Sequence, residues 1–347
     1  MPTPPAVRIV YGPTGGRFPL MFGIAHALET ALGRMGIKIL DRVGISGGAI
    51  VAAVRASNRD FEQWLTQCDG LGKHCSLLGW KTPAQLWRYF VHGGLLNSKK
   101  VLESTFQKLI PHPPTEPCWA ISWCKSADKP VAFNLTNNPL AATMVLASAA
   151  VPIAFSPVEI PNASLSDPVK SSLEVDDTGV STFIDGGLSD VFPARLIDKE
   201  VVPTIMVFID NLPLAGEEPP KDMWDKVFGM HNKSYLLAQS ARRKKTTQIF
   251  VVPAPAAFDR YRLRFDIPHD EAMTMYHHGR VMAEHSFRLM LPMSDLPEHL
   301  DQENGDGEAD TDERLRGEQT FIQVVHCQER EDQVAQTVSE QANPPQA

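Results

Sequence analysis

Apolar residues follow two patterns along the chain, short continuous runs and longer stretches with helical spacing. Within residues 22–32, Ile24, Leu28 and Leu32 recur on one face, which predicts an amphipathic helix. Short runs rich in β-branched residues predict strands at 7–12, 39–45, 118–123, 130–135, 182–184, 203–209 and 248–252. Further helices are predicted after Ser46 and within 60–110, 139–149, 221–240 and 270–290. Strands that alternate with helices predict an α/β fold whose sheet is covered on both faces.

The C-terminal part of the chain has a different composition. From about Leu296 the sequence is polar, rich in Gln, Glu and Asp, and it ends in NPPQA. This composition predicts a domain over residues 6–295, followed by an acidic, disordered tail over 296–347. Within that tail, TFIQVV at 320–325 is apolar enough to add a strand.

The charge is distributed as unevenly as the composition. The 347 residues carry a net charge of −8, but those from Asp301 onward include 12 acidic and 3 basic residues. The first 300 residues are therefore close to neutral. A body of this charge does not repel an anionic surface, and no basic footprint indicates a nucleic-acid partner.

Several classes of protein are disfavoured by simple patterns. The most apolar stretch, 140–155, is interrupted by Pro152. The opening MPTPPAVRIVYG has no basic region followed by an apolar one, so we expect no secretory signal. The five cysteines form no CxxC pair and have no metal-ligand spacing, which is typical of reduced thiols in a cytosolic protein. We therefore expect a cytoplasmic protein without a metal or cofactor, while export as an effector without a cleavable signal stays open.

The stretch VGISGGAI, residues 43–50, places one serine between glycines where a strand gives way to a helix. Gly44 and Gly48 permit a sharp turn with close packing, which exposes the hydroxyl of Ser46 above the edge of the sheet. The following helix directs its N-terminal amides at the same point. The pattern indicates a nucleophilic serine, but a buried turn whose serine caps the helix fits this pentapeptide equally well.

Two further segments change that balance. YGPTGGRFPLMFG at 11–23 is a glycine-rich loop between a strand and a helix, without the Lys of a P-loop or the Rossmann spacing. Its amides are placed to stabilise an oxyanion if Ser46 attacks an ester carbonyl. In TFIDGGLSDVFP at 182–193, Asp185 ends a strand and two glycines follow it. Three loops at one sheet edge thus offer a nucleophile, an anion cradle and a carboxylate.

In this order the motifs resemble those of the patatin-like phospholipases. The resemblance rests on the glycine loop Gly12 to Arg17, the elbow Gly44 to Gly48 and the segment Asp185 to Gly187. The segments at 146–158, LASAAVPIAFSPV, and 94–106, GLLNSKKVLESTF, are also similar to the family. The resemblance covers roughly residues 6–290 and implies a three-layer α/β/α fold with a mostly parallel central sheet.

The resemblance also implies a chemistry. Ser46 and Asp185 would form a catalytic dyad, with Asp185 accepting the serine proton and later activating water. The oxyanion hole would come from Gly15, Gly16 and Gly47, with Arg17 supporting the loop or neutralising a lipid phosphate. The family loop usually reads G-x-G-G-x-R-G, so Thr14 and Phe18 replace glycines here. Because neither residue easily adopts positive φ, we expect a loop of different shape.

Several alternatives stay open for the substrate and for the mechanism. Hydrolysis of phospholipid acyl esters at a membrane surface is favoured, but galactolipids, glycerides, simple esters and acyl transfer stay open, as does the oligomeric state. The aromatic residues of 60–110 suit a core better than an acyl channel, and ARRKK at 241–245 suits a solvated helix end better than a headgroup contact. A Ser–Asp–His α/β-hydrolase is the second enzymatic hypothesis, because five histidines follow Asp185, at His231, His269, His277, His278 and His285. A third hypothesis is a lipid-binding protein of the same fold without catalytic activity.

Overall fold

The computed structural model describes residues 5–67, 94–188, 202–209, 247–252, 254–261, 267–290 and 322–324. The main sheet contains β1 (Ala6–Tyr11), β2 (Lys38–Ile45), β4 (Cys118–Cys124), β5 (Lys129–Asn134), β7 (Val158–Pro161), β8 (Val180–Asp185), β9 (Thr204–Ile209), β10 (Thr247–Val252) and β11 (Ile322–Val324). A separate pair consists of β3 (Gly94–Leu96) and β6 (Ile153–Phe155). The seven predicted strands match observed strands to within two residues. The pattern misses β3, β6 and β7, which have only three or four residues and so show no clear alternation.

The strand order in the main sheet is β11-β10-β9-β1-β2-β4-β8-β7, with β5 also paired to β4. The pairs from β11 to β4 are parallel. The pairs β4–β5, β4–β8 and β7–β8 are antiparallel. An α/β fold with a mostly parallel central sheet is therefore confirmed. β11 lies beside β10, so the apolar segment near 320 adds a strand; the extent of the acidic tail otherwise stays a prediction.

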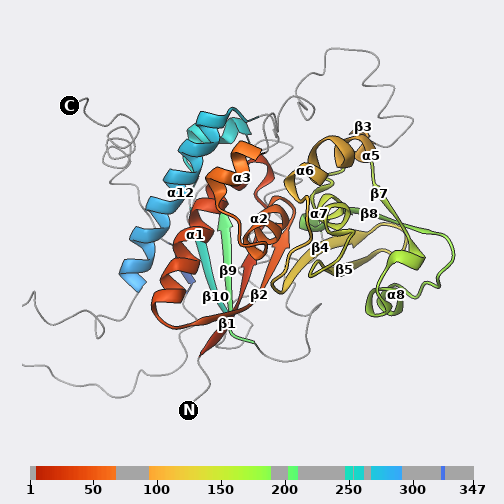
Figure 1. The fold of residues 1–347 in the computed structure, drawn as a ribbon, viewed down its shortest axis with the longest axis horizontal. Coiled ribbons are helices and arrows are strands. Elements are labelled where there is room, and N and C mark those ends of the chain that lie inside the picture. Colours follow the sequence, from red (N-terminus) through yellow and green to blue (C-terminus); the bar gives the residue numbers. More distant parts are fainter. Residues whose placement is uncertain are drawn as a thin grey trace, which may run out of the picture.

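The described helices are α1 (Phe18–Arg34), α2 (Gly47–Ala56), α3 (Phe61–Gln67), α5 (Ser98–Val101), α6 (Gln107–Leu109), α7 (Ala141–Ala149), α8 (Asp167–Leu173) and α12 (His269–Met290). Shorter turns of helix are η1 (Gly15–Arg17), η2 (Leu102–Phe106), η3 (Asn162–Ser164), η4 (Gly186–Leu188) and η6 (Ala256–Tyr261). The predicted helix at 221–240 lies outside the described residues. Figure 1 shows α1 running between α12 and α2, in contact with both. The two helices that follow the glycine loop and the elbow are thus neighbours.

Both faces of the sheet are buried. Alternate residues of a strand point to opposite faces, and Ile9 and Tyr11 of β1 join the large core that includes α1, α2, α7 and α12. On the opposite face, Val10, Val43 and Met206 belong to a second buried cluster. Burial on both faces is what a three-layer α/β/α fold requires.

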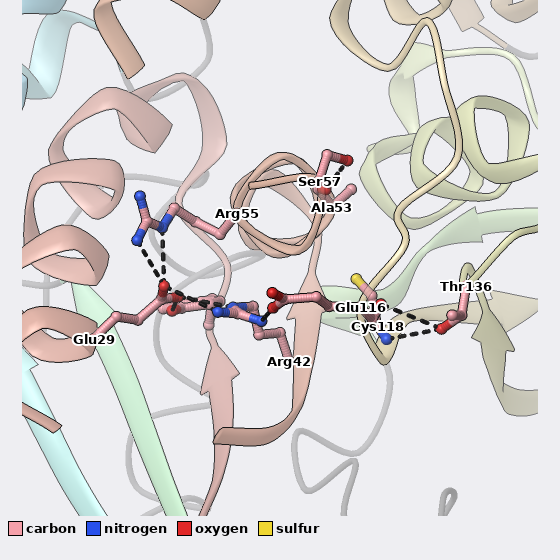
Figure 2. A network of polar contacts seen from close by, with 9 residues as sticks. Glu29, Arg42, Ala53, Arg55, Ser57, Glu116, Cys118 and Thr136 are labelled. Carbon is pink, nitrogen blue, oxygen red and sulfur yellow. Dashed lines mark hydrogen bonds and ion pairs between the residues drawn. The ribbon is translucent and has the colours of Figure 1, made fainter. Parts of the chain in front are cut away.

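A buried ionic network fixes α1 and α2 to the sheet (Figure 2). The carboxylate of Glu29 in α1 accepts hydrogen bonds from Arg42 of β2, Arg55 of α2 and the hydroxyl of Tyr11 of β1. Arg42 also donates to Glu116. Burial alone would raise the pKa of Glu29, but the hydrogen bonds and positive charges of Arg42 and Arg55 outweigh it and lower this pKa to about 2. Glu29 is therefore ionised and compensated.

Candidate active site

Ser46 lies at the joint between β2 and α2 in a strained backbone conformation. Its φ is 56° and its ψ is −129°, a region that residues other than glycine rarely occupy. A Cβ at position 44 would lie 2.2 Å from Cα of Ala49, and one at position 48 would lie 2.3 Å from the carbonyl oxygen of Tyr11. Only glycine fits these two contacts. The backbone therefore forms the sharp, glycine-dependent turn that the sequence predicts around Ser46.

The glycine loop lies directly against this elbow. A Cβ at Gly47 would be 2.2 Å from Oγ1 of Thr14 and 2.5 Å from the carbonyl oxygen of Gly15. The start of η1, which includes Gly16 and the buried Arg17, and the start of α2 therefore lie together. Since the first amides of a helix have no intrahelical acceptor, the two helix starts offer candidate donors on either side of Gly47. Gly12 anchors the loop by donating its amide to the carbonyl of Val207 at 2.8 Å.

Thr14 and Phe18, which replace family glycines, have ordinary backbone angles. Thr14 has a φ of −122° and Phe18 has a φ of −57° in the first turn of α1, so both angles are ordinary for residues with a side chain. The positive φ is at Gly15, at 56°. Neither position requires positive φ in this chain, and the expectation that the loop differs in shape from the family's stays a prediction.

Asp185 ends β8 and faces Ser46. The hydroxyl of Ser46 donates to Oδ2 of Asp185 at 2.7 Å, and the amide of Gly187 donates to Oδ1 at 2.6 Å. A Cβ at Gly187 would lie 3.3 Å from Cγ of Pro13, so the glycine loop also borders the turn after Asp185. The structure thus brings together the three segments that the sequence analysis selected.

Burial sets the protonation behaviour of Asp185. The residue is 3% exposed, and this desolvation raises the pKa of its carboxyl group to about 7, against the hydrogen bonds from Ser46 and Gly187, which lower it. A carboxylate with a pKa near 7 is a far stronger base than one at the ordinary value of 3.8. The site therefore turns a weak base into one suited to accepting a proton from serine.

The described histidines make other contacts. Nδ1 of His26 and the hydroxyl of Tyr276 share a hydrogen bond of 2.6 Å, and His278 packs its ring edge-on against Phe258. Within the described residues, no histidine hydrogen-bonds to Ser46 or Asp185. His231 and the side chain of His285 lie outside the described residues. Across the part of the chain that the structure describes, the geometry thus offers no histidine base for Ser46.

Other candidate features are structural where they are described. Trp64 is 1% exposed, packs against Phe18, Phe22 and Phe61, and donates its indole N–H to the carbonyl of Leu109. It belongs to the core, while the aromatic residues at 80–90 and the basic run at 241–245 lie outside the described residues.

Among the described side chains, no group of three or more His, Cys, Asp or Glu could hold a metal ion. The described helices also include none long and apolar enough to cross a membrane.

A match to a protein-family model includes the residues described above. The family model for patatin-like phospholipase matches residues 14–198, which is more than half of the chain and includes both Ser46 and Asp185. The chain belongs to the patatin-like phospholipase family. Membership of this family implies a lipid acyl hydrolase in the broad sense. Among curated proteins, none matches the chain.

Solved structures similar to this patatin-like chain include bacterial proteins. VipD from Legionella pneumophila aligns with a TM-score of 0.36 and 12% identity, over 79% of this chain and 67% of VipD. The type III effector protein ExoU aligns with a TM-score of 0.37 and 14% identity, over 82% of this chain and 53% of ExoU. The ExoU–SpcU complex of Pseudomonas aeruginosa gives 0.34 and 14%, over 83% and 52%. This chain thus spans about half the length of ExoU.

Proposed function

We propose that this chain is a serine lipid acyl hydrolase that cleaves acyl esters of phospholipids through a Ser46–Asp185 dyad. The observation that carries the proposal is the 2.7 Å hydrogen bond from Ser46 Oγ to Asp185 Oδ2. The glycine loop packs against Gly47, next to this pair. Family membership supports a lipid as the substrate. The near-neutral charge of the first 300 residues is compatible with transient contact with a membrane surface.

The first half of the reaction acylates the enzyme. Ser46 Oγ attacks the carbonyl carbon of the ester as its proton passes to Asp185, and the amides of Gly15, Gly16 and Gly47 stabilise the oxyanion. When the tetrahedral intermediate collapses, Asp185 donates the proton that it took from Ser46 to the departing alcohol oxygen. The acyl group remains on Ser46 as an ester. Arg17 is buried, which favours a role in supporting the glycine loop.

The second half regenerates the enzyme. Asp185 takes a proton from water, the resulting hydroxide attacks the acyl carbonyl, and the same amides hold the second oxyanion. Collapse then expels Ser46 Oγ, which recovers its proton from Asp185 and releases the fatty acid. Asp185 is ionised again at the end of each half, so the net reaction is ester plus water giving alcohol plus fatty acid.

The proposal is tested with lipid vesicles. Purified chain is incubated with phosphatidylcholine, phosphatidylglycerol, galactolipid or triglyceride dispersions, and released fatty acid is measured beside the Ser46→Ala variant. We expect release from phospholipid by the unmodified chain and none above background by the variant. A folded chain that binds the vesicles but releases no fatty acid from any of the lipids would support the lipid-binding alternative instead.

The raised pKa of Asp185 gives a prediction for the pH dependence. Because Asp185 must be ionised to accept the serine proton, kcat/KM is expected to rise with pH and to reach half its plateau near pH 7. Initial rates on a soluble acyl ester, measured from pH 4 to 9 at constant ionic strength, give the profile. A half-maximum near pH 4 would mean that an aspartate of ordinary pKa is the base.

The histidines provide a second prediction, because the α/β-hydrolase alternative requires one as the base. Removing the base of a triad costs about 10³-fold or more in turnover. We expect His26→Gln and His278→Gln to lower kcat by less than about tenfold, since their described contacts are with Tyr276 and Phe258. The same limit is expected for His231, His269, His277 and His285. One folded histidine variant as inactive as Ser46→Ala would exclude the dyad.

A further inference from the structure

The C-terminal end of α7 contacts both members of the dyad. The backbone amide of Ser46 donates to Oγ of Ser148 at 3.0 Å, and the amide of Asp185 donates to the carbonyl of Ala150 at 2.9 Å. Ser148 lies in the segment 146–158, to which the proposed chemistry assigns no role. Its side chain is fully buried.

The hydroxyl of Ser148 also makes a second hydrogen bond, to the strand that pairs with the strand of Asp185. Oγ of Ser148 donates to the carbonyl of Ile121 in β4 at 2.5 Å. That carbonyl oxygen lies only 2.0 Å from where a Cβ of Gly186 would be, directly against the residue that follows Asp185. The next residue of β4, Ser122, is paired with Asp185 in the sheet. A single hydroxyl therefore connects the backbone of Ser46 to the strand pair that carries Asp185.

We propose that Ser148 is a positioning residue, whose hydroxyl holds the Ser46 amide so that Ser46 Oγ stays within hydrogen-bond distance of Asp185. This inference rests on the proposed function of the Ser46–Asp185 pair. Ser148 does not touch the reacting atoms; it acts on them through the backbone of the elbow.

The reasoning depends on the backbone conformation of Ser46. A residue with a side chain keeps a positive φ only where its surroundings impose it, and a buried amide requires an acceptor. Ser148 satisfies both requirements, because a hydroxyl accepts one hydrogen bond while donating another. Alanine at this position can do neither. Without the bridge, the elbow is free to rotate the Ser46 hydroxyl away from Asp185.

The expected effect is on reaction rate more than on binding. A displacement of about 1 Å in a reacting group costs up to about 100-fold in rate. We therefore expect Ser148→Ala to react with a fluorophosphonate probe at Ser46 about 10- to 100-fold more slowly, with KM for a soluble ester within about twofold of the unmodified chain. Ser148→Cys, which keeps a weak donor and acceptor, is expected to be intermediate.

Ser181→Ala provides the matched control. Ser181 is 2% exposed, lies in β8 like Asp185, and donates its hydroxyl to Oδ1 of Asn162. Its replacement removes a buried hydroxyl and a hydrogen bond without touching Ser46. We expect Ser181→Ala to lower thermal stability by an amount similar to that of Ser148→Ala, while its labelling rate stays within about twofold of the unmodified chain.

The pH dependence of labelling separates positioning from a general loss of folded protein. The hydrogen bond from Ser46 lowers the pKa of Asp185, so its loss in Ser148→Ala should move the acid limb of the labelling rate to higher pH. A smaller population of folded protein would reduce the rate without moving the limb. The limb of Ser181→Ala is expected to stay in place.

Each outcome is decisive. Labelling of Ser148→Ala at a rate within twofold of the unmodified chain, or equal slowing in Ser181→Ala, would overturn the positioning role and leave the dyad intact. If Ser148→Ala does not fold, Ser148→Cys decides, and a rate equal to that of the unmodified chain contradicts the proposal. No labelling of the unmodified chain at Ser46 would overturn the proposed function, and this inference with it.

Discussion

Ester hydrolysis is expected to fall by about 10³-fold or more when Ser46 is replaced with Ala or Asp185 with Asn. Ser46 Oγ is the only oxygen of that side chain, and alanine leaves no nucleophile. Asparagine keeps the shape of Asp185 but cannot accept a proton from Ser46. The 2.7 Å hydrogen bond between the two side chains means that each depends on the other. Initial rates on a short acyl ester measure both losses.

The double variant distinguishes a dyad from two independent contributions. Residues that act as a unit give strongly non-additive losses, so Ser46→Ala with Asp185→Asn should be no less active than the worse single variant. Ser57→Ala is the control, because Ser57 follows the other end of α2 and donates to the carbonyl of Ala53. We expect it to retain full activity. Losses that add in free energy would contradict the dyad.

Folding of the Asp185→Asn variant can be checked in the same series. The folded pKa of Asp185, about 7, lies above its ordinary value of 3.8, so ionisation of this group opposes folding as the pH rises between those values. At pH 8 the neutral amide is therefore expected to melt no lower than the unmodified chain. An inactive Asp185→Asn variant that is also well folded assigns the loss to chemistry.

The largest expected effect on stability comes from Glu29→Gln. The side chain of Glu29 is 5% exposed, and its carboxylate is shared by Arg42 and Arg55. Removing its charge leaves both guanidinium groups with less compensation in the interior. Breaking a buried ion pair in this way costs about 3–5 kcal/mol. Urea denaturation at pH 7 measures the free energy of unfolding.

Glu116→Gln is the matched control for this network. Glu116 also accepts a hydrogen bond from Arg42, but its side chain is 48% exposed. A pair that solvent reaches contributes little, so we expect a loss within about 1 kcal/mol. Equal losses in the two variants would contradict the network's role.

The stabilisation by Glu29 also depends on pH. Because the pKa of Glu29 is lowered to about 2, the contribution of its carboxylate to the free energy of unfolding is complete above its ordinary pKa of 4.5 and is lost as the pH falls toward 2.

The sequence predicts the candidate site better than it predicts the structure around it. Ser46, Asp185 and the glycine loop are recognisable because each sits at the end of a predicted strand. The glycine loop and Ser46 follow the parallel strands β1 and β2, whose carboxyl ends meet at one edge of the sheet. Asp185 ends β8, which runs antiparallel to β4 and stops beside Ser122, so the sequence does not show why it reaches the same edge. The strained φ of Ser46 follows from its position in the turn, and the close contacts of Gly44 and Gly48 follow from the motif. These features are local in sequence.

The features that could not be predicted depend on distant parts of the chain. The bridge from Ser46 to Ser148 joins residues 102 positions apart, and nothing in the pattern near Ser148 indicates which amide its hydroxyl meets. Glu29 reads as a polar position on an amphipathic helix, yet it lies inside the ionic network. The sequence also does not show which residue of the glycine loop carries the positive φ, which is Gly15.

The central claim is an acyl-enzyme formed on Ser46 with Asp185 as the base. It is tested most directly by mass spectrometry of the chain quenched during turnover. The chain is mixed with an excess of a p-nitrophenyl acyl ester, quenched in acid within seconds, and digested to locate any added acyl group. We predict an acyl group on the peptide that contains Ser46, absent in Ser46→Ala and in Asp185→Asn. Ester cleavage accompanied by acylation of a different residue would contradict the account.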